Sequence, residues 1–78
     1  MLEIERDKLI RAIATVRTGL IIDALTLAGA AAVLDEHSNE DDYAIWTVIS
    51  NLKSAASLAM SASGDVDEAL DLLNESDN

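Results

Sequence analysis

The sequence predicts an all-α protein: a long helical hairpin followed by a short C-terminal helix, assembled into a helical bundle by self-association. Apolar residues recur at alternating spacings of three and four, which is the period of a helix face that packs against other helices. The 78 residues include no Pro and only three Gly, so long stretches contain nothing that interrupts a helix. We expect one domain over residues 1–78, with helices at about 2–36, 41–62 and 66–73 and a frayed tail at 74–78.

The first expected helix, residues 2–36, has more apolar surface than one partner helix can cover. Its main stripe is interrupted only by Arg17, and a second stripe lies on the neighbouring face. The second half of the helix is therefore apolar around most of its circumference, and we expect self-association to cover it. The main stripe contains Ile10, Ile13, Leu20, Ala24, Leu27, Ala31 and Leu34, and the second contains Ala14, Ile21, Leu25, Ala28 and Ala32.

The octet "DEHSNEDD", residues 35–42, is predicted to be the turn between the first two helices. Ser38 or Asn39 can cap the second helix, because each side-chain oxygen can accept a free backbone N–H. Residues 40–42, all acidic, would then occupy the first helical turn, where the helix dipole favours negative charge.

The same octet lacks the pattern of a metal site. Counted from Asp35, a calcium loop needs Gly at the sixth position and Glu at the twelfth, which here are Glu40 and Trp46. A zinc site needs three or four ligands, mostly His or Cys, and the chain has one His and no Cys. We therefore expect no metal and no cofactor.

The second expected helix, residues 41–62, has a core stripe and an unusual opposite face. The opposite face carries small hydroxyl residues where exposed helix positions usually carry Glu, Lys, Arg or Gln. Small side chains let another helix approach closely, so we expect a second contact face here. The core stripe is Ile45, Val48, Ile49, Leu52, Ala55, Ala56 and Ala59, and the hydroxyl face is Thr47, Ser50, Ser54, Ser57 and Ser61.

A third helix is expected to follow Gly64, which suits the left-handed position after a helix end. Asp65 and Glu68 have the spacing of a capping pair. The stretch "LAMSASGDVDEALDLL", residues 58–73, resembles the closing half of ubiquitin-associated domains and also the junction between tetratricopeptide repeats. The Met-Gly-Phe-type loop of the former and the repeat of about 34 residues of the latter are missing, so the chain is assigned to neither family.

The net charge of −10 is unevenly distributed. Residues 1–17 hold four basic and three acidic residues, whereas residues 18–78 hold twelve acidic residues and one basic residue, Lys53. An acidic field repels nucleic acid and attracts basic proteins. Residues 18–34 are shorter than the roughly 20 apolar residues of a membrane span and contain Asp23. We expect a cytoplasmic protein, because the sequence has no apparent signal peptide and no Cys. We also expect that it binds neither membrane nor nucleic acid.

These observations favour a non-enzymatic protein–protein interaction module that forms a homo-oligomer, with a dimer favoured. His37 and Ser38 are neighbours in a turn, which does not make a catalytic triad. The alternative is an acidic inhibitor, or a nucleic-acid mimic of the phage decoy type, that binds a basic protein surface. The expected self-association residues are Leu20, Ile21, Ile22, Leu25, Ala28, Gly29 and Ala32.

Overall fold

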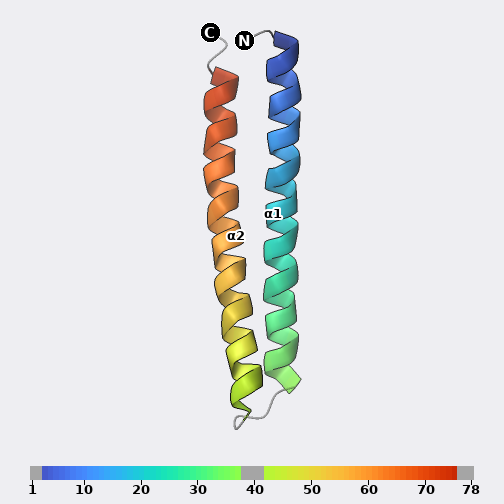
Figure 1. The fold of residues 1–78 in the computed structure, drawn as a ribbon, viewed down its shortest axis with the longest axis vertical. Helices are drawn as coiled ribbons and strands as arrows, with labels where there is room; N and C mark the ends of the chain where they lie inside the picture. Colours follow the sequence, from blue (N-terminus) through green and yellow to red (C-terminus); the bar gives the residue numbers. More distant parts are fainter. Residues whose placement is uncertain (1–2, 38–41, 76–78) are drawn as a thin grey trace.

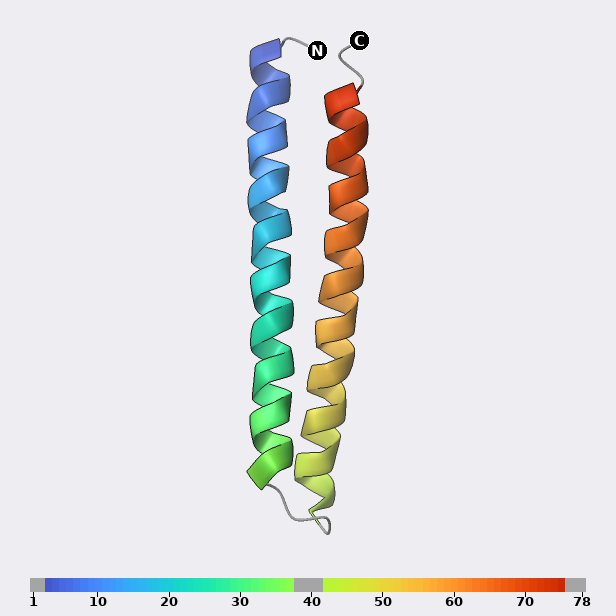
Figure 2. The ribbon, with the colours of Figure 1, turned by 180° about the vertical axis from the view of Figure 1, so that it is seen from behind.

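The protein is a hairpin of two long antiparallel helices, α1 (Glu3–His37) and α2 (Tyr43–Glu75) (Figure 1). The computed structural model describes residues 3–37 and 42–75, and every one of these residues except Asp42 is helical. The molecule measures 58 × 14 × 14 Å, and the start of α1 and the end of α2 lie at the same end of the rod. The two helices run side by side over their whole length in both views (Figures 1 and 2).

The two helices meet along a seam whose positions alternate in steps of four and three. All of these positions are buried or half-buried, and steps of this kind keep one face of each helix toward its partner, as in a coiled coil. The apolar stripe predicted for residues 10–34 is therefore confirmed. The seam consists of residues 6, 10, 13, 17, 20, 24, 27, 31 and 34 of α1 and residues 45, 49, 52, 56, 59, 63, 66, 70 and 73 of α2.

Small residues dominate the best-buried part of the seam. Ala24, Ala31 and Ala56 are buried, together with Ile49 and Leu70, and no large side chain among the described residues is fully enclosed. Small side chains allow two helices to approach closely, but they remove little apolar area from water. Since the hydrophobic contribution scales with that area, the hairpin alone has a thin core.

Ser63 lies in the seam although it is polar. Its side chain is only 6% exposed, and its hydroxyl donates a hydrogen bond of 2.7 Å to the carbonyl oxygen of Met60. This bond satisfies the hydroxyl within its own helix, so burial leaves no unpaired donor. Sequence reasoning omitted Ser63 from the core because it looked only for apolar residues.

The expected break between a second and a third helix is wrong. Helix α2 runs without interruption through residues 62–66, and none of the glycines has a positive φ. A Gly inside a helix costs about 1 kcal/mol relative to Ala, which the packing of the rest of α2 outweighs. The seam keeps its phase across Ala59, Ser63 and Val66, whereas a turn between two helices would have shifted it. Helix α2 also extends to Glu75, so Asn74 and Glu75 do not fray, and residues 76–78 lie outside the described part of the chain.

The cap of α2 is Asp42 rather than Ser38 or Asn39. The Ile45 backbone N–H donates a hydrogen bond of 3.1 Å to the Asp42 carboxylate, and the Trp46 N–H donates one of 3.0 Å to the Asp42 carbonyl. The first turn of α2 contains no acidic residue, so the expectation for Asp42 was wrong; residues 38–41 lie outside the described residues. Within the predicted core stripe, Val48 is 43% exposed and lies outside the seam.

Candidate interaction surface

An open groove crosses one flank of the hairpin near its middle. It is lined by Thr18, Ile21 and Ile22 from α1 and by Ser63, Gly64 and Asp67 from α2, with Arg17 at its edge. Because residues of both helices line the groove, these residues lie on the same side of the rod.

Helical periodicity extends this side along the hairpin. In helices packed with a seam of this kind, residues seven apart lie on the same side. Starting from the groove residues, steps of seven reach exposed residues of both helices toward the end where the chain reverses. We call this surface the groove flank. It comprises Thr18, Ile21, Ile22, Leu25, Ala28, Gly29 and Ala32 of α1 and Trp46, Ser50, Lys53, Ser57, Met60 and Gly64 of α2, all of them exposed.

The groove flank joins two surfaces that the sequence suggested separately. Six of the seven expected self-association residues belong to it, while Leu20 is half-buried in the seam. From the hydroxyl face of α2, Ser50 and Ser57 belong to it. Ser54 and Ser61 are exposed on the side of α2 turned away from α1, and Thr47, on the same row, is half-buried.

Large apolar side chains stand in solvent on this flank. Leu25 is 67% exposed, Ile22 56%, Trp46 62% and Met60 51%. Sequence reasoning did not single out Trp46, because it falls outside the core stripe of its helix. Trp is enriched among the residues that contribute most to the affinity of protein interfaces.

Charge is scarce over the middle of the hairpin. Residues 18–34 carry one charged residue, Asp23, and residues 43–64 carry one, Lys53. The acids lie toward the two ends of the rod. Asp35, Glu36 and Asp42 lie where the chain reverses, and residues 65–75 carry five acids between the groove and the other end. Asp23 is exposed in the hairpin.

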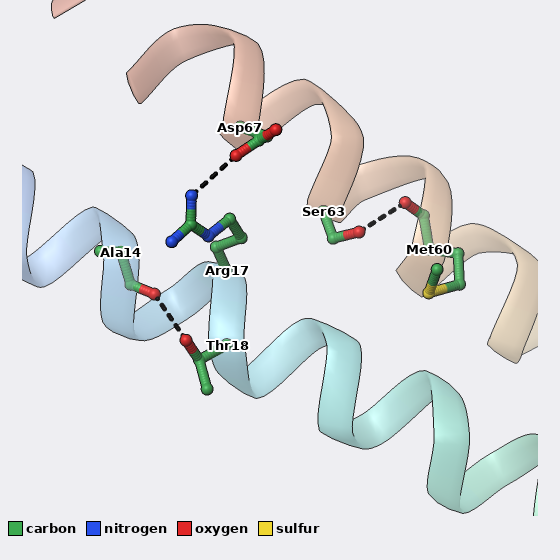
Figure 3. Close-up of polar contacts among 6 residues, drawn as sticks. All are labelled: Ala14, Arg17, Thr18, Met60, Ser63 and Asp67. Atoms are coloured by element: carbon green, nitrogen blue, oxygen red, sulfur yellow. Dashed lines mark hydrogen bonds and ion pairs between the residues drawn. The ribbon is translucent and has the colours of Figure 1, made fainter. Parts of the chain in front are cut away.

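Arg17 and Asp67 connect the two helices at one end of the groove (Figure 3). A guanidinium nitrogen of Arg17 donates a hydrogen bond of 2.7 Å to the Asp67 carboxylate, and the two side chains are 35% and 57% exposed. An ion pair this exposed contributes about 0–1 kcal/mol, so it helps to set the register of the helices more than their stability.

Among the described residues, no three His, Cys, Asp or Glu side chains are grouped closely enough to hold a metal ion. Helix α1 is long and apolar enough, by length and composition alone, to cross a membrane, and little of its most apolar stretch is buried in the hairpin. The core helix of a protein bundle has the same composition, and both Asp23 and Lys53 would face lipid if the hairpin spanned a bilayer.

Searches against protein-family models, curated proteins and solved structures each returned no match. The functional inference therefore depends on the residues of the hairpin itself.

Proposed function

We propose that this protein is a non-enzymatic interaction module that works as a homodimer, in which two hairpins form a four-helix bundle. The observation that carries the proposal is the groove flank, where Ile22, Leu25, Trp46 and Met60 are exposed. The charges on this side are Lys53 and, at the edge of the groove, the ion pair of Arg17 and Asp67. Contiguous apolar surfaces of this kind are rare on monomers and are usually covered by a partner.

The total surface of the hairpin supports a partner of the same size. A compact monomer of 8.3 kDa has about 4,600 Å² of accessible surface. The hairpin has 5847 Å², which is about 1,300 Å² more. A standard protein interface covers about 800 Å² on each partner, and homodimers often cover more. A second hairpin on one flank would therefore bring the surface per chain close to that of a compact protein.

The shape leads to the same proposal. The radius of gyration is 17.6 Å, whereas a compact chain of this length has one of about 11.5 Å. Two rods packed side by side would form a thicker particle with an interior, as four-helix bundles do. A symmetric dimer is the commonest oligomer, and it would cover the exposed apolar surface of each copy with the same surface of the other.

The alternative of an acidic decoy has less support. A nucleic-acid mimic needs carboxylates in a continuous row along one face. Here the described acids cluster near the two ends of a rod 58 Å long, and the stretches between them carry only Asp23 and Lys53. A basic partner could still bind one acidic end of the dimer.

The mass in solution tests the proposal. Size exclusion with light scattering should give twice 8.3 kDa at micromolar concentration. The same sample should stay in the aqueous fraction when it is floated with vesicles of neutral and anionic phospholipid. A monomer at high micromolar concentration, or a protein that floats with the vesicles, would overturn the proposal.

A further inference from the structure

We propose that the side of the hairpin opposite the groove flank is a second interaction surface, and that its partner is an amphipathic helix of another protein with Lys or Arg beside its apolar face. This surface lies across the seam from the groove flank, so it goes beyond the proposed dimer and leaves the dimer interface unchanged. The partner is identified by the exposed apolar residues of the surface, by its small residues and by the sign of its charges.

Helical periodicity defines this side of the rod in the same way as the groove flank. The groove residues belong to rows of seven on one side of the seam, and each helix has two further rows beside the seam on the other side. We call this surface the opposite flank. It consists of the rows that contain Gly19 and Asp23 in α1 and the rows that contain Val48 and Leu58 in α2, each continued in steps of seven.

Large apolar side chains stand in solvent along the whole opposite flank. They are Leu9, Val16 and Val33 of α1 and Val48, Leu58 and Leu72 of α2, and each is between 43% and 72% exposed. At about 1.5 Å per residue, the stretch from Leu9 to Val33 is about 36 Å long, which is the length of a helix of about 24 residues. One partner helix is therefore long enough to cover these side chains.

Small residues lie between these apolar side chains. Gly19, Ala55 and Ala62 are half-buried next to the seam, and a Cβ added to Gly19 would meet nothing within 4 Å. The distance between packed helices depends on the side chains at the contact, so small residues let a further helix come close to the backbones of α1 and α2. The opposite flank therefore suits a helix that packs along the hairpin.

The opposite flank carries no Lys or Arg. The chain has five of these residues, and the structure describes all of them. Each is either a seam position or falls on a row of the groove flank. The seam positions are Arg6 and Arg17, and the residues on groove-flank rows are Lys8, Arg11 and Lys53.

The charged side chains that the opposite flank does carry are acidic, apart from His37 at the end of α1. Asp23 lies among apolar residues near the middle of α1, and Glu5 and Asp65 lie nearer the end of the rod where α1 begins. The rows of the groove flank carry charges of both signs. A partner with Lys or Arg would therefore meet carboxylates on the opposite flank without meeting Lys or Arg there.

A second copy of this chain does not suit the opposite flank. Two opposite flanks placed together would bring carboxylates into one interface with no Lys or Arg to offset them, and like charges in contact suppress association. The groove flank of another copy carries Lys53, but the proposed dimer already covers it. A helix with an apolar face and flanking Lys or Arg covers the apolar rows and pairs with the carboxylates.

Two synthetic helical peptides of about 24 residues test the proposal. Both have the same face of Leu and Ala, and the positions beside that face carry Lys and Arg in one peptide and Glu in the other. Fluorescence anisotropy of a label on each peptide measures binding to the full chain. The basic peptide should bind once per hairpin with an affinity that falls as salt is added, and the acidic peptide should not bind. A basic peptide that fails to bind at high micromolar concentration would overturn the proposal.

A matched pair of charge reversals locates the bound peptide. Asp23→Lys and Asp71→Lys change the net charge equally at exposed sites, but Asp71 falls on a row of the groove flank. Asp23→Lys should weaken binding of the basic peptide at least about tenfold, because it places like charges in contact, and Asp71→Lys should weaken it less than about threefold. Equal weakening would mean that the peptide is attracted by the net charge alone, and the proposal would be wrong.

A second pair separates this surface from the dimer interface. Leu58→Ala should weaken peptide binding at least about threefold and leave the dimer mass unchanged, whereas Leu25→Ala should leave peptide binding unchanged. Circular dichroism shows whether each variant keeps its helices. A peptide that turns the dimer into a monomer lies on the groove flank and overturns the proposal. A chain that is monomeric but binds the basic peptide through Leu58 would contradict the dimer and support this second surface.

Discussion

At the scale of single residues, a side chain at a helix end can stabilise the helix, whereas one on an exposed face has no such role within the hairpin. Asp42 stabilises the start of α2 through its carboxylate, which accepts the Ile45 N–H at 3.1 Å. Leu25 has no comparable role within the hairpin, because two thirds of its surface is in solvent. A substitution at Asp42 should therefore weaken the fold of the hairpin directly, and one at Leu25 should weaken it through the loss of association.

Asp42→Ala should lower the free energy of unfolding by about 1 kcal/mol, because it leaves the Ile45 N–H without its acceptor. Urea denaturation followed by circular dichroism measures the change. Asp42→Ser is the matched control and should recover most of the loss, since a serine oxygen accepts the same bond. Equal stability of the Ala and Ser variants would argue against the cap.

Leu25→Glu should dissociate the dimer. It places a carboxylate on the groove flank, where association would have to bury it. Size exclusion with light scattering should show a monomer. Leu58→Glu makes the same change on the opposite flank at a residue that is 72% exposed, and it should leave the dimer intact. If neither variant changes the mass, the groove flank is not the interface.

At the scale of the helices, packing along the seam overrides local signals for a helix end. Gly64, Asp65 and Glu68 together look like a stop followed by a start, yet α2 passes through all three. Continuing α2 keeps Val66, Leu70 and Leu73 against α1, and this contact would be lost if the chain turned away. The seam residues of α2 alternate in steps of four and three from residue 45 to residue 73, but this row includes the polar Ser63, so apolar spacing alone did not reveal that it is unbroken.

In the Leu25→Glu chain, where no second copy covers the groove flank, Gly64→Ala should raise the free energy of unfolding by up to about 1 kcal/mol, because Ala has the higher helix propensity and its Cβ meets open space in the hairpin. Far-UV circular dichroism and urea denaturation report the effect. Gly19→Ala is the matched control in α1, where a Cβ also meets nothing within 4 Å. A loss of helix content in the Gly64 variant alone would indicate a break in α2.

At the scale of the whole molecule, the hairpin is too open to be stable by its own core. An unfolded chain of 8.3 kDa exposes about 12,000 Å², so folding to the hairpin removes about half of that surface from water. Domains of about 60 residues bury about 60%. Association would supply the missing burial, so folding and assembly should be coupled.

The midpoint temperature of thermal unfolding should therefore rise with protein concentration, because mass action favours the assembled state. Calorimetry over a hundredfold range of concentration measures it. Leu25→Glu should melt at a lower temperature that does not depend on concentration. A concentration-independent midpoint for the natural sequence would show that the hairpin folds without a partner.

The sequence by itself determined the helical class, the extent of α1 to within a residue at His37, and the face of each helix that enters the seam. These features depend on local propensity and on the spacing of apolar residues, which a linear pattern records. The seam also contains Ser63 and Arg17, which apolar spacing alone does not identify; their polar groups find partners at the Met60 carbonyl and at Asp67.

Only the tertiary structure decided that Gly64 lies inside a helix, that Asp42 is the cap, and that the predicted surfaces of the two helices meet on one flank. Each of these depends on how α1 and α2 are rotated and shifted against each other. That arrangement results from the combined packing of eighteen seam positions, which no local pattern contains. A stripe on one helix and a row of serines on another become a single surface only when both helices are in place.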